Sequence, residues 1–138
     1  MADPVALAAT IEAALKTIPG ITAYDGYVPT KVPESGGYIL PHVVIWAGTG
    51  DSPPEQPACG EHEDDTLIFD FQTTIVAATP DLCRRVEKDV RAKLRNMRAG
   101  TGRIKPNPDG FQQQAPILDT QVTPARFMLP KQWRLITN

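Results

Sequence analysis

The amino-acid sequence predicts an α+β protein with one mostly antiparallel β-sheet packed against two α-helices. Two segments carry apolar residues at helical spacing, and each begins with a helix-capping residue followed by proline. Other segments alternate apolar and polar residues, or are rich in β-branched and aromatic residues, as strands are. The 138 residues fit one domain, 1–138, in which most connections are short enough for neighbouring elements to pack together.

The first helix is predicted to begin at Asp3-Pro4. Asp3 can accept hydrogen bonds from free backbone N–H groups, and Pro4 suits the first helical position, where no donor is lost. Pro19-Gly20 ends the helix. The residues expected to face the core are Leu7, Ile11, Leu15 and Ile18.

The next strands are predicted at 21–24 and 38–47, separated by an extended loop rich in Gly and Pro at 25–37. The segment 38–47 is apolar on both alternating faces, which suggests that one side meets the core and the other side meets something else. Pro41 lacks an N–H, which favours an edge or a bulge there.

A further strand at 67–75 shows the clearest alternation and is expected to line the core through Leu67, Phe69, Phe71 and Ile75. The second helix follows from Thr79-Pro80 to about Arg98, with Gly100 beyond its end. Its apolar stripe consists of Leu82, Val86, Val90, Leu94 and Met97. Two last strands are predicted at 111–122 and 127–136.

The composition of the chain limits the classes of partner that it can bind. A net charge of −2 and a pI of 5.6 give no bulk attraction to nucleic acid or to an anionic membrane, so a protein partner is expected. No stretch approaches the roughly 18 apolar residues of a membrane span, and the N-terminus lacks a signal-peptide pattern. We expect a soluble protein made in the cytoplasm, without a membrane partner, whose Cys59 and Cys83 are free thiols.

No catalytic, metal or cofactor site is predicted, and the chain is not expected to be an enzyme. Cys59 and His62 supply only two of the four ligands of a structural zinc site. The glycine-rich pairs at 48–50 and 100–102 lack the lysine of a phosphate-binding loop. His42 has no nucleophile motif nearby, so a histidine satisfied in the core or at an interface is favoured over a catalytic base.

The second helix is basic and holds half of all Lys and Arg in the chain. These residues are Arg84, Arg85, Lys88, Arg91, Lys93, Arg95 and Arg98. Each of its acids, Asp81, Glu87 and Asp89, has a basic residue four positions later, which stabilises a solvated helix. A solvated or protein-contacting face is therefore favoured over a nucleic-acid patch.

A long acidic loop is predicted at about 48–66. It contains Asp51, Glu55, Glu61, Glu63, Asp64 and Asp65 without one Lys or Arg. A solubilising loop and a binding role are equally compatible with this composition. In a ring around DNA, acids facing the channel would repel phosphates and let the duplex slide, whereas acids facing outward could meet the basic helix of a neighbouring subunit.

Four segments in a fixed order carry a family resemblance. They are Ile18-Pro-Gly-Ile-Thr-Ala-Tyr-Asp-Gly26, Gly37-Tyr-Ile-Leu-Pro-His-Val-Val-Ile-Trp46, Phe69-Asp-Phe-Gln-Thr-Thr-Ile-Val76 and Val122-Thr-Pro-Ala-Arg-Phe-Met-Leu-Pro-Lys-Gln-Trp133. Together they resemble tail terminator proteins of long, non-contractile-tailed (siphovirus-type) bacteriophages, particularly those of actinobacterial hosts. The family is recognised by its order of elements, so the resemblance implies no catalytic residue.

The resemblance implies a virion protein at the head-proximal end of the tail. It implies a hexameric ring that caps the tail tube protein, ends tube polymerisation and docks to head-completion or neck proteins, while DNA passes through without sequence-specific binding. The expected subunit or partner contacts are Tyr38, Trp46, Arg84, Arg85, Lys88, Arg91 and Arg95. Two alternatives stay open: a head-to-tail connector or neck stopper, and a small nucleic-acid-binding domain that uses the basic helix.

Overall fold

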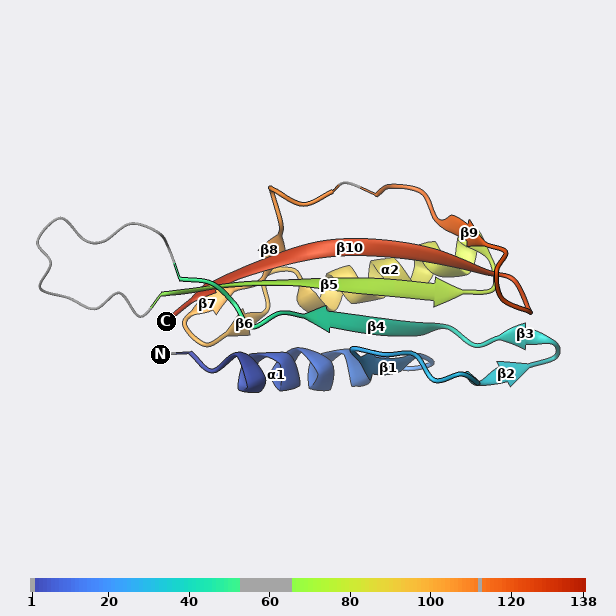
Figure 1. The fold of residues 1–138 in the computed structure, drawn as a ribbon, viewed down its shortest axis with the longest axis horizontal. Coiled ribbons are helices and arrows are strands. Elements are labelled where there is room, and N and C mark those ends of the chain that lie inside the picture. The colour runs from blue at the N-terminus through green and yellow to red at the C-terminus, as the bar shows by residue number, and fades with distance from the viewer. Residues whose placement is uncertain (1, 53–65, 112) are drawn as a thin grey trace, which may run out of the picture.

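The computed structural model describes residues 2–52, 66–111 and 113–138 (Figure 1). Its helices are α1 (Pro4–Lys16) and α2 (Pro80–Leu94). The longer strands are β1 (Thr22–Asp25), β4 (His42–Ala47), β5 (Leu67–Ala77) and β10 (Arg126–Thr137). The short strands are β2 (Glu34–Ser35), β3 (Tyr38–Ile39), β6 (Arg98–Ala99), β7 (Gly102–Arg103), β8 (Lys105–Pro106) and β9 (Ile117–Asp119).

Both helices begin where the capping residues predict. A side-chain oxygen of Asp3 accepts a hydrogen bond from the N–H of Val5 at 2.9 Å, and Thr79 Oγ1 accepts one from the N–H of Leu82 at 3.1 Å. A proline follows each cap, at the position where its missing N–H costs no hydrogen bond.

The predicted end of the second helix near Arg98 is wrong, because α2 stops at Leu94. Asn96 takes a left-handed backbone conformation (φ 65°) and its N–H donates to the carbonyl of Ile104 at 2.8 Å. The chain therefore turns back on itself, and Arg98 lies in the short hairpin formed by β6 and β7.

The main sheet is mixed, with the order β1-β4-β5-β10-β8, and β9 also pairs with β10. β1 runs parallel to β4, while the other pairs in this sheet are antiparallel. The pairing of β5 with β10 joins Leu67 with Thr137 and Ala77 with Phe127. The α+β class, with two helices and a largely antiparallel sheet, is thus confirmed.

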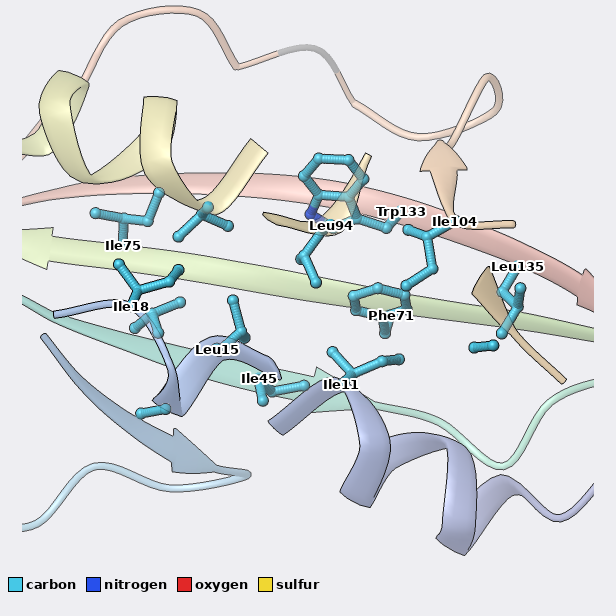
Figure 2. Packing of buried hydrophobic residues seen from close by; sticks show 14 of the residues in the cluster. Ile11, Leu15, Ile18, Ile45, Phe71, Ile75, Leu94, Ile104, Trp133 and Leu135 are labelled. Carbon is cyan, nitrogen blue, oxygen red and sulfur yellow. The ribbon is translucent and has the colours of Figure 1, made fainter. Parts of the chain in front are cut away.

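Both helices cover the same face of this sheet. The odd-numbered residues of β4, β5 and β10 face α1 and α2, and the apolar ones among them form one core with the helices (Figure 2). Ile11 and Leu15 of α1 point towards the strand residues Ile45 and Phe71 (Figure 2). Trp133 is 3% exposed and its indole N–H donates to Thr73 Oγ1 at 2.9 Å, so its one polar atom is satisfied inside the core.

The predicted strand 38–47 is divided in two. Pro41 has no N–H for the ladder, and the chain breaks there into β3 and β4. β3 pairs with β2 as a hairpin that lies next to the start of β4 (Figure 1), and β2 lies inside the stretch predicted to be a loop. The predicted strand at 111–122 is reduced to β9, and at its start the N–H of Phe111 binds the side chain of Gln132 and not a backbone carbonyl of the sheet.

Candidate interaction surfaces

The face of the sheet opposite the helices carries an apolar patch, which we call the open sheet face. Within the described parts of the chain, no helix covers it. A shallow hollow of about 380 Å³ lies on it. Its lining residues are Val28, Val44, Trp46, Gln72, Thr74, Val76, Ile117, Met128 and Pro130. Seven of these nine side chains are apolar, although this face points away from the core.

Trp46 is the largest side chain of the open sheet face and is 44% exposed. Its indole N–H donates to Thr74 Oγ1 at 3.2 Å, and the same hydroxyl accepts a hydrogen bond from Gln72 Nε2 at 2.9 Å. The ring is therefore held in one orientation with almost half of the residue uncovered. A pre-oriented aromatic residue loses little conformational entropy on binding, which makes it an effective interface anchor.

Ion pairs replace the apolar residues towards the other end of the same face. Arg134 binds Asp70 through two hydrogen bonds of 2.8 and 3.0 Å, and it donates to Asp109 at 2.8 Å. These hydrogen bonds hold the pKa of Arg134 above its usual value. The open sheet face is thus apolar around Trp46 and charged around Arg134.

Tyr38, the other strand residue expected at an interface, is 66% exposed. It lies in β3, on the hairpin next to the start of β4, and so does not share a strand with Trp46 (Figure 1). The expectation that both residues lie on one continuous strand is wrong, because Pro41 interrupts that strand. Tyr38 and Trp46 can contact the same partner only if that partner reaches from the hairpin to the sheet.

The five basic residues expected at an interface, Arg84, Arg85, Lys88, Arg91 and Arg95, are all exposed on α2 or at its C-terminal cap. Two of the three predicted pairs form: Asp81 with Arg85 at 3.0 Å, and Glu87 with Arg91, where Arg91 Nε lies 3.1 Å from the carboxylate. The Glu87 carboxylate raises the pKa of Arg91 through this hydrogen bond. Asp89 and Lys93, both described, form no ion pair with each other.

A second hollow, of about 230 Å³, lies between α2 and β10. We call it the α2–β10 cleft, and its lining residues are Glu87, Arg91, Arg95, Pro106, Phe111, Gln113, Gln114, Lys131, Gln132 and Trp133. The sequence does not predict this cleft, because Lys131 and Phe111 lie far along the chain from the helix. Lys131 gave a usable signal, since it interrupts the apolar positions of β10 that face the helices.

Of the acidic loop, the structure places only Asp51 among the predicted acids. Its backbone N–H donates to the carbonyl of Ile68 at 2.8 Å and its carbonyl accepts from the N–H of Ile68 at 2.7 Å, so the predicted loop begins with a β-bridge. The side chain of Asp51 is exposed. The predicted residues Glu55, Glu61, Glu63, Asp64 and Asp65 lie outside the described residues, as do Cys59 and His62.

The structure describes two of the residues considered for chemistry, His42 and Cys83, and both are buried. His42 lies on the sheet face opposite the helices, whereas Cys83 lies on α2 and packs into the core on the other face. Burial lowers the pKa of His42, whose ring lies edge-on to Tyr24 at 5.6 Å between centroids. Burial raises the pKa of the Cys83 thiol to about 11. No group of three or more His, Cys, Asp or Glu side chains gathers as metal ligands in the described ranges.

Neither helix in the described ranges is long and apolar enough to span a bilayer. The fold and its surfaces define an α+β protein with one sheet face under two helices, while the other face has no helix over it in the described residues and is partly covered by the small buried cluster of Val32, Ile39 and Val76. No protein-family model and no curated protein sequence matches the chain.

Proposed function

We propose that this chain is a structural, non-enzymatic virion protein that assembles with copies of itself into a tail-terminator-like ring. The ring, a hexamer by resemblance, sits at the head-proximal end of a phage tail tube. It ends polymerisation of the tube and docks to the head-completion proteins. DNA crosses the ring without sequence-specific contacts.

The open sheet face is the observation that carries this proposal. Trp46 and Ile117 are each 44% exposed and lie around one apolar hollow. Contiguous exposed apolar surface with a polar surround is typical of protein–protein interfaces, because burying it there removes it from water. The helices already pack on the other face of the sheet, so another chain is the natural cover.

The distribution of charge supports a closed ring. α2 carries five of the 14 basic residues beside three acids, and the sequence 48–66 carries six of the 16 acids and no Lys or Arg, while the net charge of the chain is only −2. A head-to-tail contact joins two different surfaces and closes into a ring when the rotation between subunits allows it. Opposite charges on separate segments suit a contact of this kind, since each subunit offers one sign to each neighbour.

One other class of function has a specific observation in its favour. Arg84, Lys88 and Arg95 are exposed and take part in no ion pair with another described residue. They make α2 a candidate surface for a nucleic-acid backbone. Such binding would weaken steeply with salt, because each phosphate contact releases counterions. A protein that assembles without DNA and shows no such salt dependence fits the structural role.

Electron microscopy of the purified protein, alone and with tail tubes, tests the proposal. We expect annuli, and annuli seated at one end of each tube. Deletion of the gene should give overlong tails, whereas tails of normal length that fail to join heads would indicate a connector or neck stopper. A protein that stays monomeric at high concentration, even beside its tube, would contradict the proposal.

A further inference from the structure

The α2–β10 cleft is a recess with defined walls on the helix-covered side of the sheet. α2 supplies one wall through Glu87 and Arg91, and the chain around Phe111 supplies the other. Trp133 and Lys131 of β10 form part of the lining between them. The cleft lies on the face opposite Trp46, so it is separate from the open sheet face.

The wall opposite α2 is fixed by hydrogen bonds to β10. The N–H of Asn107 donates to the carbonyl of Gln132, and the N–H of Phe111 donates to the side-chain oxygen of Gln132, both at 3.0 Å. Lys131 Nζ donates to the carbonyl of Gln113 at 2.7 Å. A wall held in this way is formed before any ligand arrives, which lowers the entropic cost of binding.

The chemistry of the cleft selects an anionic chain with apolar groups. Arg91, Arg95 and Lys131 bring three cations to it, against the single carboxylate of Glu87, which Arg91 already binds. Phe111 adds an aromatic ring that is 47% exposed. Exposed aromatic residues bind proline-rich segments, and cations beside them select acidic flanking residues.

We propose that the α2–β10 cleft binds residues 53–65 of a neighbouring copy of this chain. That segment has five acids and no Lys or Arg, and it begins Pro53-Pro54-Glu55-Gln56-Pro57. Its Pro-x-x-Pro spacing is the sequence pattern that aromatic-lined grooves recognise. The acids then complement the cations of the cleft. The inference rests on the proposed self-assembly and assigns one of its contacts.

Cysteine chemistry gives a direct test on the full chain. Cys59 lies within the segment, while the Cys83 thiol is fully buried and its pKa is raised to about 11, so a maleimide at neutral pH reacts selectively with Cys59. We would attach a benzophenone maleimide to Cys59 of the ¹⁴N protein and mix it with ¹⁵N protein that carries no benzophenone. After irradiation, mass spectrometry maps the cross-linked peptides. We expect cross-links from the ¹⁴N copy to ¹⁵N peptides that cover Arg91–Arg95, Phe111 or Lys131.

Charge reversal sharpens the test. Arg95→Glu should lower the yield of these intermolecular cross-links about tenfold, and a mixture of Arg95→Glu protein with labelled Glu55→Lys protein should restore it, because the signs are exchanged. Lys93→Glu is the matched control: it makes the same charge change on the same helix but outside the cleft lining, and should leave the yield unchanged.

The outcomes separate this inference from the proposed function. Annuli in the microscope with intermolecular cross-links only outside the cleft would overturn the inference and leave the ring intact. Cleft cross-links confined to single copies would show docking within one chain and would also overturn it, as would cross-links formed only with the tail tube protein. A protein that is monomeric and forms no cross-link between ¹⁴N and ¹⁵N copies would contradict both proposals.

Discussion

Replacing Trp46 by alanine should weaken self-association by roughly 15- to 110-fold. The residue is 44% exposed. A fully buried aromatic side chain removes about 150–250 Å² from water, so covering the exposed part accounts for roughly 65–110 Å². At about 25 cal/mol per Å², this area contributes roughly 1.6–2.8 kcal/mol per subunit contact, which corresponds to the stated change in Kd.

Sedimentation velocity over a concentration series measures that change directly. Trp46 also packs within its own chain and donates to Thr74, so circular dichroism and a thermal melt must show that the variant remains folded. Val5→Ala is the control, because Val5 is 77% exposed on α1, away from the open sheet face. A folded Trp46→Ala protein that associates as tightly as the parent would refute the assignment of this face as a subunit contact.

Three further predictions concern the fold that presents these surfaces. Thr73→Val should lower the free energy of unfolding by about 1–3 kcal/mol in urea titration, because the buried indole N–H of Trp133 loses its acceptor. Gly102→Ala should cost about 1–3 kcal/mol or more by the same measurement, since a Cβ there meets the carbonyl oxygen of Ile136. The unfolding free energy should also fall as the pH drops below about 6.5, by at most about 1.4 kcal/mol per pH unit from His42.

The sign of the His42 effect follows from burial. Burial lowers the pKa of His42 in the folded state, and the nearby Arg126 adds to this lowering, so the unfolded chain binds the proton first as the pH falls. The contribution of His42 is complete above the unfolded pKa of about 6.5 and is lost between that value and the lower folded pKa. His42→Phe should remove this component of the pH profile, and a profile unchanged by the substitution would contradict the argument.

Matched variants test the causes given for the losses of stability in Thr73→Val and Gly102→Ala. Thr73→Val should cost much less in a Trp133→Phe background, since no donor is then left unpaired; equal costs in both backgrounds would rule out the hydrogen bond as the cause. Gly48→Ala is the control for Gly102→Ala, because a Cβ at Gly48 meets no atom closer than 3.7 Å. If both glycine variants lost the same stability, the close backbone approach at Gly102 would not be the reason.

Local signals in the sequence predict the parts of the fold that depend on local chemistry. The caps at Asp3 and Thr79 locate both helix starts, because side-chain acceptors and proline act within one turn. The alternation after Leu67 identifies β5 and its core face, because a strand buried on one side must alternate. These features need no knowledge of distant residues.

Features set by distant partners could not be read in the same way. The end of α2 depends on a hydrogen bond between Asn96 and Ile104, and the pairing of β5 with β10 depends on residues about 60 positions apart. The hairpin that carries Tyr38 arises because Pro41 ends one ladder and leaves β3 free to pair with β2. The α2–β10 cleft has the same origin, since Phe111 and Lys131 meet α2 only after the sheet has formed.

The central position of β10 also sets the order of events during synthesis. β5 leaves the ribosome long before its partner, and until residues 126–137 emerge it has no neighbour on that side. The core around Trp133 cannot close earlier either. Partly made chains should therefore remain unfolded and be substrates for chaperones. A copy that lacks this strand should therefore also lack the closed core on the helix side of the sheet.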